Sequence, residues 1–93
     1  MSEDLKELRG QIDSIDAQLV DLFKQRMNVS RDIAAYKKAH SMPTLDAGRE
    51  RALLAKVGEQ AGEELAEYTE SVFRSILAAG RSYQNQCSGV QSQ

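Results

Sequence analysis

The sequence predicts an all-α protein made of three helices per chain, one long, one short and one of medium length. Apolar residues recur at gaps of three and four, and alternating apolar–polar strand patterns are absent. Glycine and proline are sparse, at six and one among 93 residues, and β-branched residues do not cluster. The length suits one domain with a modest core.

The first helix is predicted over residues 3–40. An apolar stripe with gaps of three and four runs along it, as in a coiled-coil seam, with one cationic member. The stripe comprises Leu5, Leu8, Ile12, Ile15, Leu19, Leu22, Arg26, Val29, Ile33 and Tyr36. Gly10 weakens the helix by up to about 1 kcal/mol without changing its register. Pro43 requires the helix to end before it.

Two shorter helices are predicted after Pro43. The second covers residues 47–57, with Asp46 as its N-cap and Gly58 as its C-terminal stop. The third covers residues 63–86. Its apolar face comprises Leu65, Tyr68, Val72, Phe73, Ile76 and Leu77.

The chain therefore divides into a helical domain, residues 1–86, and a polar tail or linker, residues 87–93, that could lead into a fused enzyme. The first helix would be about 55 Å long at about 1.5 Å per residue. The other two helices together barely match that length, so much of the apolar stripe would face water in a lone chain. A second copy would cover it, which predicts a homodimer with the long helices packed together.

Composition excludes several classes of function. Lys and Arg total 12 against 14 Asp and Glu, and this net charge of −2 does not fit nucleic-acid binding. Aromatic residues make up 5% with no tryptophan, so a base-stacking surface is not expected. No apolar run is long enough for a membrane, and the first residues lack a signal-peptide core. The single cysteine, Cys87, allows no internal disulfide, so a cytoplasmic protein is expected.

Arg26 interrupts the apolar stripe, and Lys37 lies on the same side of the predicted helix. They are eleven residues apart, which corresponds to about three full turns plus roughly 20°. Both side chains therefore point the same way, and they are about 16 Å apart along the helix axis. The row beside the stripe is spaced by sevens and comprises Arg9, Asp16, Phe23, Ser30 and Lys37. Two interpretations stay open: salt bridges or snorkelling, with Asp16 and Glu50 as partners, or an anionic ligand whose carboxylates bind guanidinium groups.

Arg9 lies 17 residues before Arg26, about 26 Å along the helix. The two cannot share a metabolite-sized site on one straight helix, but in an antiparallel dimer the partner's Arg9 could reach it. Arg49 and Glu50 add charges near the start of the second helix.

The usual reactive groups are missing from this pattern. His40 is expected at the surface and Cys87 in the polar tail. There is no Gly-rich phosphate loop, no metal-ligand spacing and no triad-like context. An enzyme made from these residues would need no nucleophile, metal or cofactor, and would act through positioning and electrostatics.

Three segments carry a family resemblance. "LRGQIDSIDAQLVDLFKQRMNVSRDIAAYK", "DAGRERALL" and "VFRSILAAGRSYQ" closely resemble the all-helical chorismate mutase family, over about residues 5–84. The resemblance implies an intertwined homodimer that converts chorismate to prephenate by an intramolecular Claisen rearrangement, in two equivalent sites.

The resemblance also implies roles for particular residues. Arg9 would cross to the partner's site, Arg26 would bind a substrate carboxylate, and Arg49 would support the carboxylate-binding end. Lys37 would contact a carboxylate and the ether oxygen, to which Gln84 would be the second donor. Glu50, with the backbone at Asp46, would hold the substrate hydroxyl.

The sequence departs from the family pattern at Gly80, where many members have a serine that contacts a carboxylate. Ser82 lies on a different face. Gly80 either leaves room for a water or a shifted Arg81, or serves close helix packing. Gln84 has a second reading as a polar residue near a fraying helix end.

Two other functions stay open from the sequence. An isochorismate pyruvate-lyase on the same scaffold would use much the same cationic pocket. A catalytically silent helical domain for dimerisation or regulation would need no pocket, but leucine at position 26 would suit it better than arginine.

Overall fold

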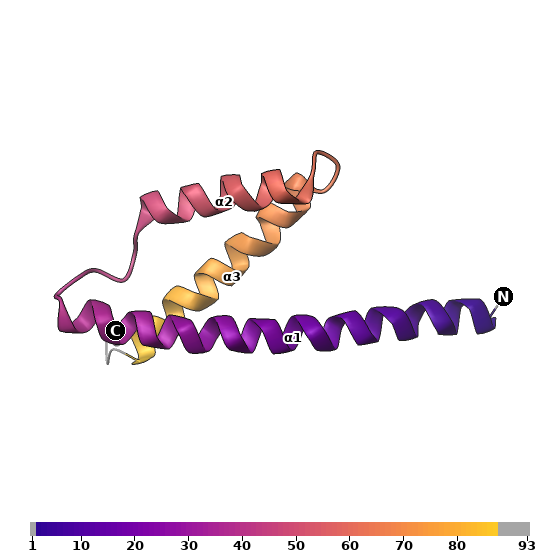
Figure 1. The fold of residues 1–93 in the computed structure, drawn as a ribbon, viewed down its shortest axis with the longest axis horizontal. Helices are drawn as coiled ribbons and strands as arrows, with labels where there is room; N and C mark the ends of the chain where they lie inside the picture. The colour runs from indigo at the N-terminus through magenta and orange to yellow at the C-terminus, as the bar shows by residue number, and fades with distance from the viewer. Residues whose placement is uncertain (1, 88–93) are drawn as a thin grey trace.

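The computed structural model describes residues 2–87, with side chains from residue 4 onward, and these residues form helices joined by short turns (Figure 1). The helices are α1 (Ser2–Ala39), α2 (Ala47–Ala61) and α3 (Ala66–Cys87). The all-helical, three-helix prediction is confirmed for this part of the chain. Residues 88–93, most of the expected polar tail, lie outside the described residues.

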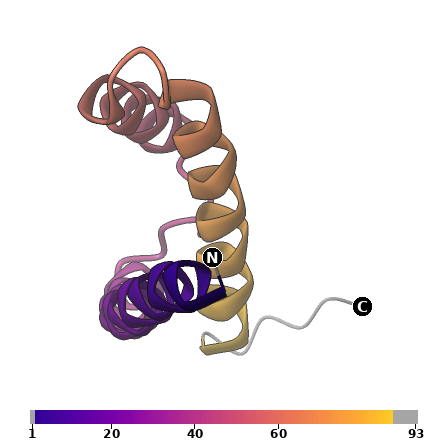
Figure 2. The same ribbon diagram turned by 90° about the vertical axis from the view of Figure 1, so that its right-hand side faces the viewer.

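α1 sets the shape of the molecule, which measures 57 × 27 × 23 Å. α3 packs on α1 and α2 packs on α3, whereas the α1 and α2 backbones stay apart, with no Cα–Cα distance of 8 Å or less among the described residues. Figure 2 looks along α1 and shows α3 beside the other two helices, spanning from α2 to α1. The N-terminal half of α1 extends beyond both partners (Figure 1).

α1 ends through a backbone motif as well as through Pro43. Ser41 adopts a left-handed conformation, φ 54°, and the N–H of Met42 donates to the carbonyl of Lys37 at 2.8 Å. The N–H of Ser41 donates to Lys38, which completes a Schellman motif. This motif turns the chain away from α1 one residue before the expected end.

α2 begins as predicted and ends later. The Asp46 carboxylate accepts a hydrogen bond from the N–H of Arg49 at 3.0 Å, so Asp46 is the N-cap. The prediction that Gly58 ends the helix is wrong, because Gly58 lies buried inside α2. A Cβ there would lie 2.5 Å from the Glu70 carboxylate, which shows how closely α2 and α3 approach. Gly62, at φ 88°, is the C-cap.

α3 begins three residues later than predicted. Residues 63–65 form a turn in which the N–H of Leu65 donates to the carbonyl of Gly62 at 3.2 Å. The helix then continues to Cys87, so Gln84 lies within α3.

Little of the chain is enclosed by its own packing. Among the described residues the buried hydrophobic side chains are Ala34 and Val57, and the buried polar ones are Ser30 and Gln84. The apolar stripe of α1 from Leu5 to Leu22 stays between 48% and 58% exposed. The expectation that this stripe faces water in a lone chain is confirmed. Within residues 2–87, no helix has the length and hydropathy needed to cross a bilayer.

Candidate active site

A pocket of about 480 Å³ lies where α1, α3 and the start of α2 converge. Its lining comes from α1 (Arg26, Val29, Ser30, Ile33 and Lys37), the α1–α2 connection (Thr44 and Asp46), α2 (Arg49, Glu50 and Leu53) and α3 (Leu77, Gly80, Arg81 and Gln84). The predicted site residues meet here, with the exception of Arg9. Arg9 is exposed on the free half of α1.

The charges of the pocket favour an anion. Among the described lining residues, four side chains are cationic and two are carboxylates, a formal excess of two positive charges. Neither Arg26 nor Arg49 forms an ion pair within the described part of the chain. Their guanidinium groups are thus available to an incoming carboxylate, for which the planar fork of donors is well matched.

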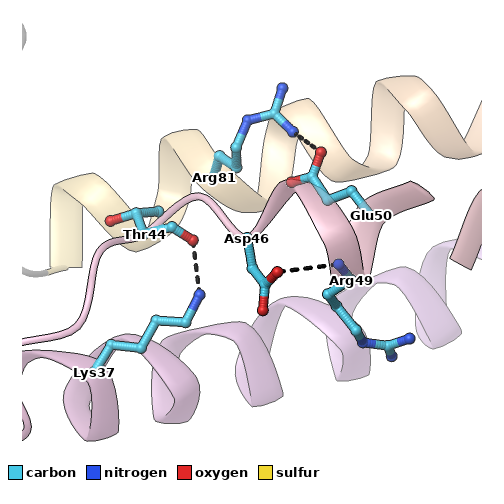
Figure 3. A network of polar contacts seen from close by, with 6 residues as sticks. All are labelled: Lys37, Thr44, Asp46, Arg49, Glu50 and Arg81. Atoms are coloured by element: carbon cyan, nitrogen blue, oxygen red, sulfur yellow. Dashed lines mark hydrogen bonds and ion pairs between the residues drawn. The ribbon is translucent and has the colours of Figure 1, made fainter. Parts of the chain in front are cut away.

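Lys37 is held in place by the connection between α1 and α2. Its Nζ donates to the carbonyl of Thr44 at 2.7 Å, and the Thr44 hydroxyl donates to Oδ1 of Asn85 on α3 at 2.8 Å (Figure 3 shows the first contact). An ammonium group has three N–H donors. Lys37 can therefore keep this contact and still donate to a ligand.

Asp46 and Glu50 are both anchored in the structure. The Asp46 carboxylate caps α2, and the Asp46 carbonyl accepts the N–H of Glu50 at 3.0 Å. The Glu50 carboxylate is bound by Arg81, with Nη1 and Oε1 2.5 Å apart (Figure 3). Glu50 thus pairs with a cation of α3, whereas Asp16, the other partner considered for the cations, is exposed on α1 outside the pocket.

Gly80 is buried where α3 meets α1. A Cβ at this position would lie 3.7 Å from Nη1 of Arg26 and 3.7 Å from Oγ of Ser30, an ordinary van der Waals separation. Close packing therefore does not require glycine here, and Gly80 opens space next to the Arg26 guanidinium. Ser82 is exposed and outside the pocket lining, so it does not replace the missing hydroxyl.

Gln84 is 9% exposed and lines the pocket one helical turn beyond Gly80. Gln84 lies in the last turn of α3, near the helix end, but its side chain is buried there and not exposed to solvent. Its amide offers N–H donors to a ligand in the pocket.

Sequence reasoning missed part of the lining. Arg81 and Thr44 lie close in sequence to the predicted site residues Gly80 and Asp46. Their contacts are with residues of other helices, which helical periodicity within one segment cannot predict. Ser30 stood in the row spaced by sevens with Lys37, and that row was the signal that could have found it. The apolar walls come from Val29, Ile33, Leu53 and Leu77.

The pocket contains no histidine or cysteine among its described lining. His40, as expected, is exposed at the end of α1, where its ring stacks on Tyr36 with centroids 4.0 Å apart. No cluster of His, Cys, Asp or Glu suited to a metal ion occurs within the described residues.

The half-apolar, cation-rich pocket of this all-helical fold is suited to a small organic polyanion. The comparisons identify the family. The family model for chorismate mutase type II matches residues 8–85, and the chain belongs to this family.

The chain is also similar to two named proteins, one of which is a mutase by name. The chain is 33% identical over 87 residues to the T-protein of Haemophilus influenzae, an alignment covering 90% of this chain and 23% of that protein. It is 35% identical over 46 residues to a 4-amino-4-deoxychorismate mutase of Streptomyces venezuelae, covering 50% of this chain and 45% of the relative. The chain thus matches less than half the length of either relative. No solved structure is a significant match.

Proposed function

We propose that this protein is a chorismate mutase, which converts chorismate to prephenate by an intramolecular Claisen rearrangement. The observation that carries the proposal is the convergence of Arg26, Lys37, Arg49 and Gln84 on one pocket in a chain of this family. Chorismate is a dianion, and the formal excess of two positive charges complements it. No metal or cofactor is needed for the reaction.

Catalysis would begin with positioning. Arg26 and Arg49 hold the substrate carboxylates, and the Asp46 backbone with Glu50 holds the ring hydroxyl. Fixed anchors at both ends favour the folded conformer in which the enolpyruvyl group lies over the ring. The entropy loss of adopting that conformer then occurs when the substrate binds, and it does not add to the barrier of the chemical step. The side chains of Val29, Ile33, Leu53 and Leu77 give the pocket apolar walls for the reacting carbons.

Electrostatic stabilisation of the transition state would be the second contribution to catalysis. In the rearrangement the ether C–O bond breaks while a C–C bond forms, and negative charge grows on the ether oxygen. Lys37 and Gln84 donate hydrogen bonds to that oxygen, and these strengthen as the charge develops. No proton is transferred in this rearrangement.

The active form would be an intertwined homodimer in the cytoplasm. A second copy packed antiparallel along α1 covers the exposed stripe from Leu5 to Leu22. It also carries its own Arg9 to this pocket, where it adds a cation for the substrate. The matched segment covers 23% of the T-protein, so that relative contains much further sequence, which supports fusion or association with a second enzyme.

The Streptomyces relative supplies a second candidate substrate, 4-amino-4-deoxychorismate, since its aligned segment is 35% identical to this chain. The two alternatives from the sequence, an isochorismate pyruvate-lyase and a silent helical domain, are not favoured by the family or by the name of the Streptomyces relative.

An absorbance assay for chorismate loss, with identification of the product, tests the proposal. We expect prephenate as the product from chorismate. In a parallel assay with isochorismate as the substrate, we expect no release of pyruvate. Unchanged chorismate would contradict the proposed activity, and pyruvate from isochorismate would assign the pocket to the lyase.

A further inference from the structure

The ion pair between Arg81 and Glu50 lies in the pocket wall, and the rearrangement itself does not use it. Nη1 of Arg81 and Oε1 of Glu50 are 2.5 Å apart, and the two side chains are 36% and 21% exposed. Both line the pocket, Glu50 from α2 and Arg81 from α3 (Figure 3). A ligand group that binds Glu50 therefore also meets the Arg81 guanidinium.

This pairing changes what Glu50 recognises. The contact engages Oε1, and Oε2 remains an acceptor for a donor on the ligand. A neutral hydroxyl needs only that acceptor. An ammonium group would gain from an unpaired carboxylate, but here Arg81 cancels much of the negative charge and repels the ammonium.

We propose that the Arg81–Glu50 pair determines substrate specificity, by selecting a ring bearing a neutral hydroxyl over one bearing an ammonium group opposite Glu50. The inference rests on the proposed function and deepens it, because it chooses between the two candidate substrates. An aliphatic amine is protonated at neutral pH, so the 4-amino compound carries one positive charge that chorismate lacks. The pocket's formal excess of two positive charges suits the dianion better than this more weakly anionic analogue.

The test compares kcat/KM for chorismate and for 4-amino-4-deoxychorismate with the full chain. The wild type should prefer chorismate. Arg81→Met keeps much of the side-chain length and removes the charge, so the chorismate preference should fall by about tenfold as Glu50 becomes an unpaired carboxylate. Glu50→Gln should raise the preference, because Arg81 then faces the ammonium without compensation. Opposite changes from the two halves of one pair are a signature that a structural salt bridge would not give.

Two variants serve as controls. Arg81→Lys keeps the charge and should preserve the ratio to within about twofold. Arg74→Met removes another α3 arginine that pairs with a glutamate, Glu70 at 3.8 Å, outside the pocket lining, and should leave the ratio unchanged. If far-UV circular dichroism shows that Arg81→Met is unfolded, Arg81→Gln takes its place.

The outcomes separate the two proposals. A wild type that rearranges chorismate, with a ratio unmoved by a folded Arg81 variant, overturns the specificity role alone. A wild type that prefers the amino compound also overturns it. A wild type that rearranges neither compound overturns the proposed function, and this inference with it.

Discussion

Arg26 occupies an apolar position of the α1 stripe, yet it is half-buried and faces a pocket instead of another helix. Its Nη1 lies beside the space that Gly80 leaves open, and no carboxylate within the described residues pairs with it. A half-buried cation without a partner costs stability, and an anionic ligand removes that cost. We therefore expect the residue to contribute to ligand binding rather than to the fold.

Arg26→Ala should lower kcat/KM for chorismate by about two to three orders of magnitude, because a charge-assisted contact to the substrate is lost. The thermal midpoint should stay the same or rise, since an unpaired cation is removed. Chorismate consumption and circular dichroism measure the two effects. Arg31→Ala, an exposed α1 arginine next to Asp32, is the matched control and should change neither. A large loss of helical signal in Arg26→Ala would show a structural role instead.

Thr44 links Lys37 to α3, since its carbonyl accepts from Nζ of Lys37 and its hydroxyl donates to Asn85. Thr44→Val keeps the shape and removes the hydroxyl, so the carbonyl that orients Lys37 becomes less well fixed. We expect kcat to fall by roughly fivefold to tenfold with little change in KM. Thr44→Ser keeps the hydroxyl and should retain most of the wild-type rate in steady-state kinetics. Equal effects of the two substitutions would exclude this positioning role.

At the scale of the element, the ends of the helices depend on backbone conformations that only some residues adopt easily. Ser41 closes α1 in the left-handed region, at φ 54°, and Gly62 closes α2 at φ 88°. Serine carries a steric cost in that region that glycine avoids. The α1–α2 connection starts at the Schellman motif of Ser41. The motif therefore also helps to position Thr44 and Asp46, which line the pocket.

Ser41→Gly should stabilise the protein by about 0.5 kcal/mol, because relief of the left-handed strain exceeds the added entropy of the unfolded chain. Gly62→Ala should destabilise it by about 1 kcal/mol or more, because alanine is strained at that φ. Urea unfolding at one protein concentration measures both changes. A lower midpoint for Ser41→Gly would mean that Ser41 makes a stabilising contact that offsets its strain.

At the scale of the whole molecule, a single chain buries few of its hydrophobic side chains, which among the described residues are Ala34 and Val57. The large hydrophobic side chains of the free half of α1 are about half exposed, and Arg9 lies among them. In the proposed dimer the same half-helix buries its stripe and delivers Arg9 to the partner's pocket. Assembly and catalysis would then depend on one interface.

Mixed dimers test this shared site. Arg9→Ala and Lys37→Ala homodimers should each be nearly inactive, since every pocket has one lesion. In a heterodimer one pocket escapes both lesions, so full exchange of an equimolar mixture should restore about a quarter of wild-type activity. Sedimentation should give a dimer at micromolar concentration. No recovery after verified subunit exchange, or a monomer in sedimentation, would contradict a site built from two chains.

The gaps of three and four and the Asp46 cap are local signals, and they located α1 and the start of α2 to within a residue. Gly58 misled the prediction because a glycine inside a helix and a glycine that ends one look alike in sequence. The difference lies in Glu70 on α3, which packs against Gly58.

The sequence by itself determined the three helices, the helix face shared by Arg26 and Lys37, and the family, because helical periodicity and motif spacing are properties of neighbouring residues. Only the tertiary structure decided that α3 packs against both α1 and α2, and that Arg81 meets Glu50 while Thr44 meets Lys37 and Asn85. Those partners lie on different elements or across a turn. Their contacts depend on how the helices cross and how the chain turns between them, which no period along one helix encodes.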